Sequence, residues 1–127
     1  MENNKWKVNI IIKSKYHNKK CSFGEYKFDS IKEKNRYITL LSLVQKGEIK
    51  DLVLQPRFLL QDKFKRNGQT YRKIEYVSDF QYFSVLKSKT IIEDVKASKS
   101  FTTDVYKIKK KLFLNLLSVN VEFNEVY

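Results

Sequence analysis

The chain has 127 residues, of which 42% are hydrophobic and 14% aromatic, so it is long enough for one globular domain with a single core. Its formal net charge of +12 indicates a polyanionic partner, nucleic acid first, unless the lysines only reflect a biased coding composition. The sequence contains no apolar run of about eighteen residues, which excludes a transmembrane helix and favours a protein without a membrane partner.

The use of cysteine and histidine narrows the chemistry further. The single cysteine, Cys21, cannot form an internal disulfide, which predicts a reducing compartment, the cytoplasm. The single histidine, His17, lies in a polar stretch and is predicted to be an exposed loop residue, so no His/Cys set for structural zinc exists. The shortage of histidines therefore favours hydrolytic chemistry based on carboxylates, lysine and a hard metal ion, because a histidine-based nuclease would rest on His17 alone.

Residues 1–28 are predicted to precede the core of a single domain that spans residues 1–127, with the core at 29–127. Residues 5–13 have the pattern of a strand, and residues 14–20 form a polar, basic loop or arm. Within residues 21–28, the triplet Phe23-Gly24-Glu25 predicts a tight turn between two short strands.

The first helix is predicted to begin at Ser30 and to end at Gly47. One face of it carries residues at helical spacing: Glu33, Tyr37, Leu40, Leu41 and Val44. A carboxylate on an inward face needs a partner, because an unpaired buried charge is costly. Two explanations fit Glu33: its side chain folds back onto the Ser30 amide in a capping box, or it belongs to a metal site or its surroundings.

A long hairpin is predicted to follow. Residues 49–61 have a strand pattern with Pro56 marking a bulge or an edge, and residues 62–70 form a turn that contains Asn67-Gly68, a strong hairpin signal. Residues 71–83 form the returning strand. Asp79 is a charged residue in this aromatic run, and taken alone it is either a strand-end or turn residue or a ligand.

Residues 90–96 have the pattern of an apolar, β-branched strand between two polar stretches. Because side chains alternate along a strand, Asp94 and Lys96 share one face with Ile92, whereas Glu93 points the other way. Taken alone, Asp94 and Lys96 are either two solvated charges at a strand end or part of a metal-dependent site that cuts a phosphodiester.

The second helix is predicted to follow a polar connection, with Thr102 or Thr103 as N-cap and Asp104 in the first turn. Its inward stripe is predicted to be Val105, Ile108, Leu112 and Leu116. A last strand follows at residues 119–126. After the N-terminal strand and arm, the order helix, three strands, helix, strand predicts an α/β or α+β domain with a mixed central sheet flanked by helices.

In this order the sequence resembles the PD-(D/E)xK nuclease superfamily, and within it a family of small phage-encoded endonucleases. The resemblance covers nearly the whole chain from about residue 15, and the matching stretches are Phe28-Asp29-Ser30 with Lys32-Glu33, Leu54-Gln55-Pro56, Asn67-Gly68 with Thr70-Tyr71-Arg72, Asp79-Phe80, Glu93-Asp94-Val95-Lys96, and Asp104-Val105-Tyr106-Lys107 with Lys109-Lys110-Lys111-Leu112-Phe113. Ser78 stands where the superfamily name has proline, and Ala97-Ser98 stand where such phage proteins usually have a glycine.

The resemblance implies a restriction-endonuclease-like core and a metal-dependent DNA endonuclease of phage recombination, repair or DNA processing, with a structure-specific, junction-resolvase-like activity as one option. It implies that Asp79 and Asp94 hold Mg²⁺, with Mn²⁺ as an alternative, that Glu33 completes the metal site, and that Lys96 orients the attacking water. Gln55 either borders the site or makes a structural hydrogen bond, and Glu75 is a reserve ligand because it has the strand parity of Asp79.

DNA is the expected partner, and many such nucleases act as homodimers. The cations expected at its backbone are Lys107, Lys110, Lys111, Lys63, Lys65 and Arg66, with the arm residues Lys13, Lys15, Lys19 and Lys20, although for most of them, taken singly, a solvated surface charge is the better explanation. Tyr16, Tyr106 and Phe113 are candidates for base stacking, with core packing the better explanation of Phe113. The alternatives are a non-catalytic nucleic-acid-binding phage protein of the same fold and a structural phage protein that neutralises packaged DNA.

Overall fold

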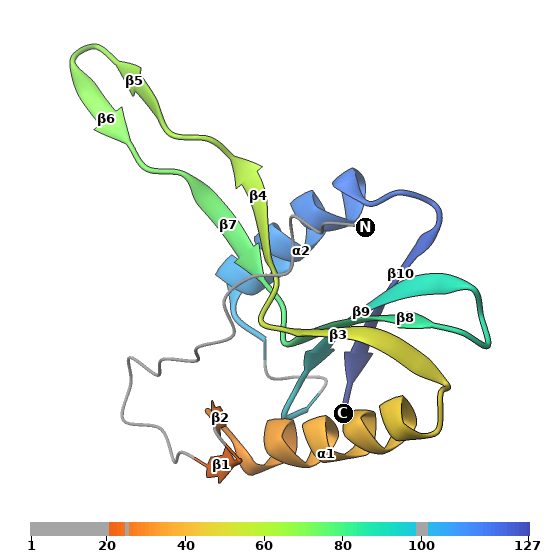
Figure 1. The fold of residues 1–127 in the computed structure, drawn as a ribbon. Coiled ribbons are helices and arrows are strands. Elements are labelled where there is room, and N and C mark those ends of the chain that lie inside the picture. Colours follow the sequence, from red (N-terminus) through yellow and green to blue (C-terminus); the bar gives the residue numbers. More distant parts are fainter. Residues whose placement is uncertain (1–20, 25, 99–101) are drawn as a thin grey trace.

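A computed structural model describes residues 21–24, 26–98 and 102–127 of the chain (Figure 1). It is a mixed α+β structure built on a four-stranded sheet, which confirms the predicted fold class. The strand and basic arm predicted within residues 1–20, with Lys13, Lys15, Tyr16, His17, Lys19 and Lys20, lie outside the described residues.

The predicted N-terminal hairpin and first helix are both present. Strands β1 (Cys21–Phe23) and β2 (Tyr26–Phe28) pair antiparallel, and helix α1 spans Ile31–Gln45. The Ser30 hydroxyl accepts a hydrogen bond of 3.1 Å from the Glu33 amide, which satisfies one of the free donors at the helix start. Gly47, with φ +77°, follows the helix, where a left-handed residue ends it without strain.

The central sheet has the strand order β10-β9-β8-β3. Its members are β3 (Ile49–Leu54), β8 (Phe80–Ser84), β9 (Lys89–Val95) and β10 (Val121–Val126). Strands β3, β8 and β9 pair antiparallel, whereas β10 pairs parallel to β9 because helix α2 carries the chain between them.

The long hairpin leaves the sheet as a projecting arm, residues 57–77 (Figure 1). It consists of β4 (Arg57–Gln61) paired with β7 (Ile74–Val77) and of β5 (Phe64–Arg66) paired with β6 (Gln69–Tyr71). The predicted turn over residues 62–70 is wrong in extent, because strand pairing continues on both sides of Asn67-Gly68. Both of these residues have positive φ, 52° and 77°, as a two-residue hairpin turn requires.

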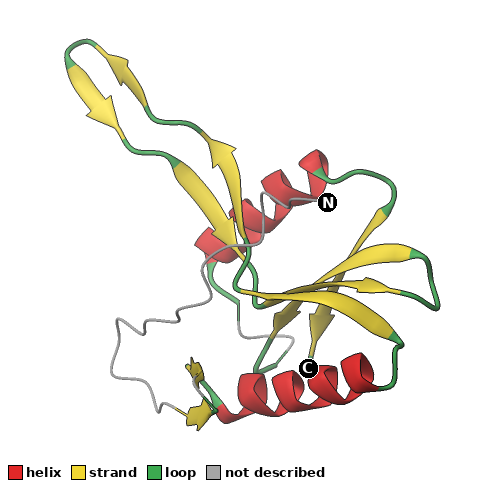
Figure 2. Cartoon of the chain, in the orientation of Figure 1, coloured by secondary structure: helices red, strands yellow, loops and turns green. Residues whose placement is uncertain are grey.

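The two helices cover opposite faces of the sheet (Figure 2). On the α1 face the core contains Phe28, Tyr37, Leu40, Phe80 and other buried side chains. On the α2 face a second core joins Phe58 and Tyr76, from the base of the arm, to Phe113. The base of the arm is thus anchored in a hydrophobic core, while its distal strands β5 and β6 are exposed along their whole length.

Helix α2 spans Asp104–Leu116, and Thr103 is its N-cap, which accepts a hydrogen bond of 3.0 Å from the Tyr106 amide. The predicted inward stripe is wrong: Val105, Ile108, Leu112 and Leu116 are 63%, 61%, 45% and 60% exposed. The helix instead packs through Phe113, which is 2% exposed, with Tyr106 and Leu117 beside it. An aromatic side chain buries more area than a leucine, and here the helix buries its aromatic face and exposes its aliphatic face.

Within the described ranges, no helix is both long enough and apolar enough to cross a membrane.

Candidate active site

Asp79 and Asp94 lie side by side at the corner where the arm leaves the sheet. Phe80 pairs with Glu93 in the antiparallel ladder of β8 and β9, so the preceding Asp79 lies opposite Asp94. The Asp79 backbone closes the corner on both sides, since its N–H donates to the Glu93 carbonyl (3.0 Å) and its carbonyl accepts from the Gln55 N–H (2.9 Å). The two acids are therefore held by main-chain hydrogen bonds.

Asp94 is buried and has two polar partners on one carboxylate oxygen. The Tyr76 hydroxyl donates to its Oδ2 over 2.5 Å, and Lys96 Nζ lies 3.1 Å from the same oxygen. Burial, together with the charge and hydrogen bond of Asp94, raises the pKa of Tyr76, so this tyrosine stays protonated as a donor. The predicted common face of Asp94 and Lys96 is confirmed by their ion pair.

Lys96 is held from two sides. Its ammonium pairs with Asp94 and also lies over the Tyr106 ring, 3.3 Å from the ring centroid. Such a cation–aromatic contact is attractive and fixes the direction of an otherwise flexible side chain. The Tyr106 hydroxyl donates in turn to Glu125 Oε2 over 2.5 Å, which fixes the ring.

Glu33 reaches the same corner from the first turn of α1. It is 6% exposed, and its Oε2 has no hydrogen-bond partner. Burial, followed by the negative charges of Asp29 and Asp94, raises its pKa to about 7. Only half of the predicted capping box forms: Ser30 caps the Glu33 amide, whereas Oε2 of the Glu33 carboxyl has no hydrogen-bond partner.

Asp79 is half-buried, and its carboxyl lies deep among neighbouring groups. Burial and then the charges of Glu33 and Asp94 raise its pKa well above its usual value. A hydrogen bond of 2.6 Å from the Val95 amide to its Oδ2 opposes this increase. Three carboxyl groups from α1, β9 and the arm–sheet corner thus lie close enough to interact electrostatically, and the charge of Asp94 makes Glu33 and Asp79 harder to ionise.

The three carboxyl groups offer oxygen donors of the kind that a divalent ion prefers. In residues 21–24, 26–98 and 102–127, no three His, Cys, Asp or Glu side chains are arranged to hold a metal together. Mg²⁺ does not require three, because it is commonly held by one or two carboxylates and keeps several waters. The unpartnered, buried Oε2 of Glu33 beside two mutually repelling aspartates is the donor chemistry that a hard cation satisfies.

Glu93, directly before Asp94 in the chain, faces the other side of the sheet, as predicted. It is 1% exposed and forms a bidentate pair with Arg36, at 2.8 and 2.5 Å. The Tyr82 hydroxyl donates to the same carboxylate over 2.5 Å. All of its partners are on the α1 face, so Glu93 is a structural ion-pair residue and not part of the acid cluster, which consists of Glu33, Asp79 and Asp94.

Two secondary predictions have different outcomes. Gln55 lies at the corner in a left-handed conformation, φ 51°, and the contact that it makes there is the structural hydrogen bond from its backbone to Asp79. The prediction from strand parity that Glu75 is a reserve metal ligand is wrong. Because the strand breaks at Ser78 and Asp79, Glu75 belongs to the arm, where it pairs with Arg57 (3.2 Å) and Lys73 (3.3 Å).

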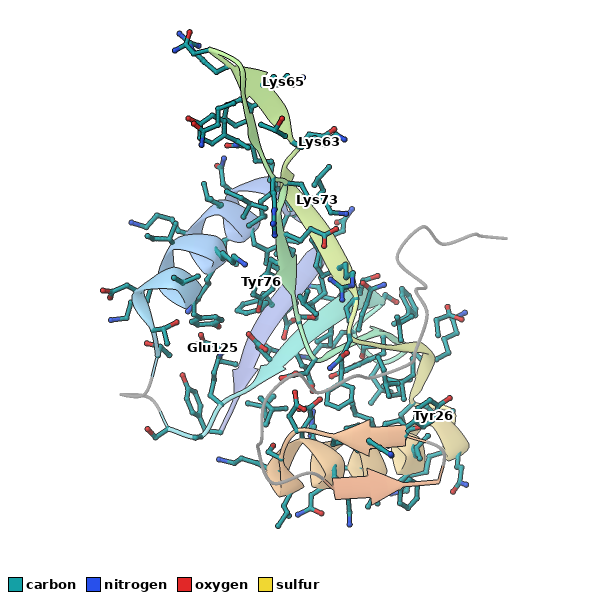
Figure 3. All side chains as sticks on the ribbon, turned by 90° about the vertical axis from the view of Figure 1, so that its left-hand side faces the viewer. Tyr26, Lys63, Lys65, Lys73, Tyr76 and Glu125 are labelled. Carbon is teal, nitrogen blue, oxygen red and sulfur yellow. The ribbon has the colours of Figure 1, made fainter. Side chains whose placement is uncertain are left out.

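The cations predicted to hold DNA fall into two groups. Lys107 and Lys111 on α2 are exposed, and Lys63, Lys65 and Arg66 are exposed on the distal arm. Lys110 is instead half-buried and paired with Glu125 over 3.0 Å, which makes it a less available phosphate contact. Figure 3 shows Lys63, Lys65 and Lys73 along the arm, with Tyr76 at its base.

Sequence reasoning missed two residues of the site and gave a different role to a third. Tyr76 binds Asp94 and was not singled out, because a tyrosine in an aromatic strand is usually a core residue. Asp29, whose Oδ1 is buried without a partner, adds its charge to that of Glu33. Tyr106, a candidate for base stacking, has its ring against Lys96 and its hydroxyl on Glu125, while Phe113 is a core residue as expected.

Comparison with known proteins identifies one family. The model of the family "Protein of unknown function (DUF1064)" matches residues 13–125. The chain belongs to this family. The match includes every residue of the acid cluster and of the arm, so both are parts of the family's domain. No curated protein and no solved structure matches the chain.

Proposed function

We propose that this protein is a metal-dependent DNA endonuclease of the PD-(D/E)xK superfamily. The observation that carries the proposal is the meeting of Asp79, Asp94 and Glu33 at one corner, with Lys96 paired to Asp94. Glu33 comes from α1, Asp79 from the junction of β7 and β8, and Asp94 from β9, which Lys96 follows directly. The formal charge of +12 supports a polyanionic substrate.

Each residue has a definite task in this proposal. Asp79, at the junction of β7 and β8, and Asp94, on β9, would hold Mg²⁺, and Glu33 would complete the site. The ion, when bound, supplies positive charge to the scissile phosphate and acidifies a water molecule. Lys96, fixed between Asp94 and Tyr106, directs its ammonium to the phosphate and the attacking water and stabilises the charge that develops.

Exposed cations on two elements hold the DNA backbone around this corner. Lys107 and Lys111 lie on α2, and Lys63, Lys65 and Arg66 lie on the arm. Such contacts do not depend on base sequence and weaken with salt, because each phosphate that is neutralised releases counterions. The alternative function is a DNA-binding protein of the same fold without hydrolysis.

A comparison of the wild-type protein with one variant distinguishes the endonuclease from the DNA-binding protein without hydrolysis. Plasmid, linear duplex and branched DNA are incubated with the wild-type protein and with Asp94→Asn in Mg²⁺, in Mn²⁺ and in EDTA. The nuclease cuts at least one substrate with metal, and both EDTA and the substitution abolish cutting. If no substrate is cut while DNA binding persists in both proteins, the non-catalytic alternative is correct.

A further inference from the structure

The distal half of the arm has no structural task in the described part of the fold. Strands β5 and β6 are exposed at every position, and their side chains do not belong to either core. A two-stranded hairpin that packs on nothing is marginally stable in water. Its residues are therefore best explained by a partner that covers them.

One face of the distal arm carries a parallel aromatic pair. Phe64 and Tyr71 are cross-strand partners, and their rings lie 4.9 Å apart at 13°. Each is 43% exposed. By strand alternation, Arg66 and Gln69 share this face, and Lys65 and Thr70 lie on the opposite one. The rings stabilise the hairpin but also offer flat, accessible π surface beside a guanidinium.

The positive charge of the arm indicates that its partner is an anion. Residues 62–73 contain five cations and one acid, for a net charge of +4. The acid, Asp62, accepts a hydrogen bond from the Lys63 amide. In the part of the chain that the structure describes, no carboxylate pairs with Lys63, Lys65, Arg66 or Arg72, whereas Arg57 and Lys73 near the base share Glu75. Arg66 therefore shares the face of the aromatic pair, and the other unpaired cations flank that pair along the two strands.

We propose that the distal arm binds DNA at an interruption of base stacking, such as a nick, a flap or a branch point. Phe64 and Tyr71 stack on the base exposed there, and Lys63, Lys65, Arg66 and Arg72 contact the flanking phosphates. Stacking on aromatic side chains tolerates any base, and it requires a base that is not already stacked on both sides. This inference rests on the proposed function for the kind of substrate, and it names the class of DNA.

The length of the arm sets where the interruption lies. The ten residues from Arg57 to Arg66 span at most roughly 30 Å at about 3.3 Å per residue. This is close to one turn of B-form DNA, about 34 Å. Because the arm leaves the sheet beside Asp79, the interruption that its tip binds lies within about one helical turn of the phosphate at the acid cluster.

The test measures binding without cleavage. Fluorescence anisotropy in EDTA compares continuous duplex, nicked duplex and a four-way junction of equal length, with the full-length protein. We expect the wild-type protein to prefer the interrupted probes roughly tenfold, the order of one base–aromatic stack. Phe64→Leu/Tyr71→Leu keeps an apolar cross-strand pair, and we expect it to lose this preference while its affinity for continuous duplex stays the same.

Charge reversal tests the phosphate contacts. Lys65→Glu/Arg66→Glu lowers the affinity for every probe and reduces the slope of log affinity against log salt by about 2. Lys46→Glu, at the exposed end of α1, is the control, and we expect a smaller effect per reversed charge there. Equal effects of the arm and control variants, or a leucine variant that keeps the preference, would overturn the proposal.

The outcome is independent of catalysis. If the arm variants lose the preference but no DNA is cut in Mg²⁺, the arm inference stands and the endonuclease proposal fails. If DNA is cut and the arm variants bind every probe like wild type, the endonuclease proposal stands and the arm inference fails. Circular dichroism of each variant verifies that the fold is retained.

Discussion

The Tyr76 hydroxyl donates a hydrogen bond of 2.5 Å to Asp94 Oδ2, and this bond joins the base of the arm to the acid cluster. Both groups are buried, so the bond is sheltered from water. Groups that orient a metal ligand in this way commonly contribute tenfold or more to metal affinity.

Tyr76→Phe removes the donor and keeps the ring in its core. We expect Mg²⁺ to bind roughly tenfold more weakly, because Asp94 is then oriented by Lys96 alone. Isothermal titration with Mg²⁺ and Mn²⁺ measures the effect. Tyr71→Phe on the exposed arm is the matched control, and an unchanged affinity in Tyr76→Phe would show that the bond does not position a metal ligand.

Lys96 is predicted to act on the substrate and not on the metal. Lys96→Met retains an unbranched apolar side chain against Tyr106 and removes the charge. We expect the cleavage rate to fall by about 10² to 10³, the usual effect of losing one preorganised electrostatic contact. The metal-induced rise in Tm should persist in this variant. If cleavage survives and metal binding is lost, the roles that we assign to Lys96 and the acids are reversed.

The raised pKa of Glu33 makes the stability of the metal-free protein depend on pH. Its folded pKa of about 7 exceeds the usual 4.5, so between these values the folded state binds more protons than the unfolded state. The free energy of unfolding therefore decreases as pH rises through this window. Ionising Glu33 in place costs stability, because its carboxylate is buried beside Asp29 and Asp94.

Glu33→Gln removes this dependence. In EDTA at about pH 8, we expect it to raise the free energy of unfolding by on the order of 2 kcal/mol, and to change it little at about pH 4. Urea denaturation at both pH values measures the difference. Asp51→Asn, an exposed position with φ 57° that asparagine tolerates, is the control and should have no such effect. A loss of stability at about pH 8 in Glu33→Gln would contradict the arrangement.

Metal ions are expected to relieve the repulsion among the three acids. At about pH 8, saturating Mg²⁺ or Mn²⁺ should raise Tm by roughly 5 °C or more, and by less at about pH 6, because protons then compete with the metal for Glu33. Asp79→Asn should be more stable than wild type in EDTA and gain nothing from metal. An equal gain in wild type and Asp79→Asn would place the bound ion elsewhere.

Much of this arrangement follows from local sequence signals. Ser30 and Gly47 set the bounds of α1, Asn67-Gly68 the turn of the hairpin, and strand alternation the opposite faces of Asp94 and Glu93. These features depend on neighbours in the chain, and local patterns describe such neighbours well.

Features that depend on contacts between residues far apart in the chain could not be predicted from local sequence signals. The spacing of Val105 and Ile108 identifies an apolar stripe on α2, but spacing does not say which side of a helix finds a core. Phe58 and Tyr76 pack on Phe113, and the apolar stripe therefore faces outward. The break at Ser78 and Asp79 likewise comes from the arm, whose exit changes the parity on which the assignment of Glu75 rested.

The adjacent acids Glu93 and Asp94 offer the sharpest comparison, because they are neighbours in sequence and have separate tasks. Glu93→Gln leaves Arg36 and Tyr82 without their buried anion, and we expect it to lower the free energy of unfolding by about 3 kcal/mol. Cleavage per folded molecule should stay within about threefold of wild type, since all the partners of Glu93 lie on the α1 face. Asp94→Asn should do the opposite, with cleavage and metal binding lost and the fold retained. Paired urea denaturation and cleavage assays measure both variants, and a Glu93→Gln protein that is fully folded but inactive would make Glu93 part of the active site.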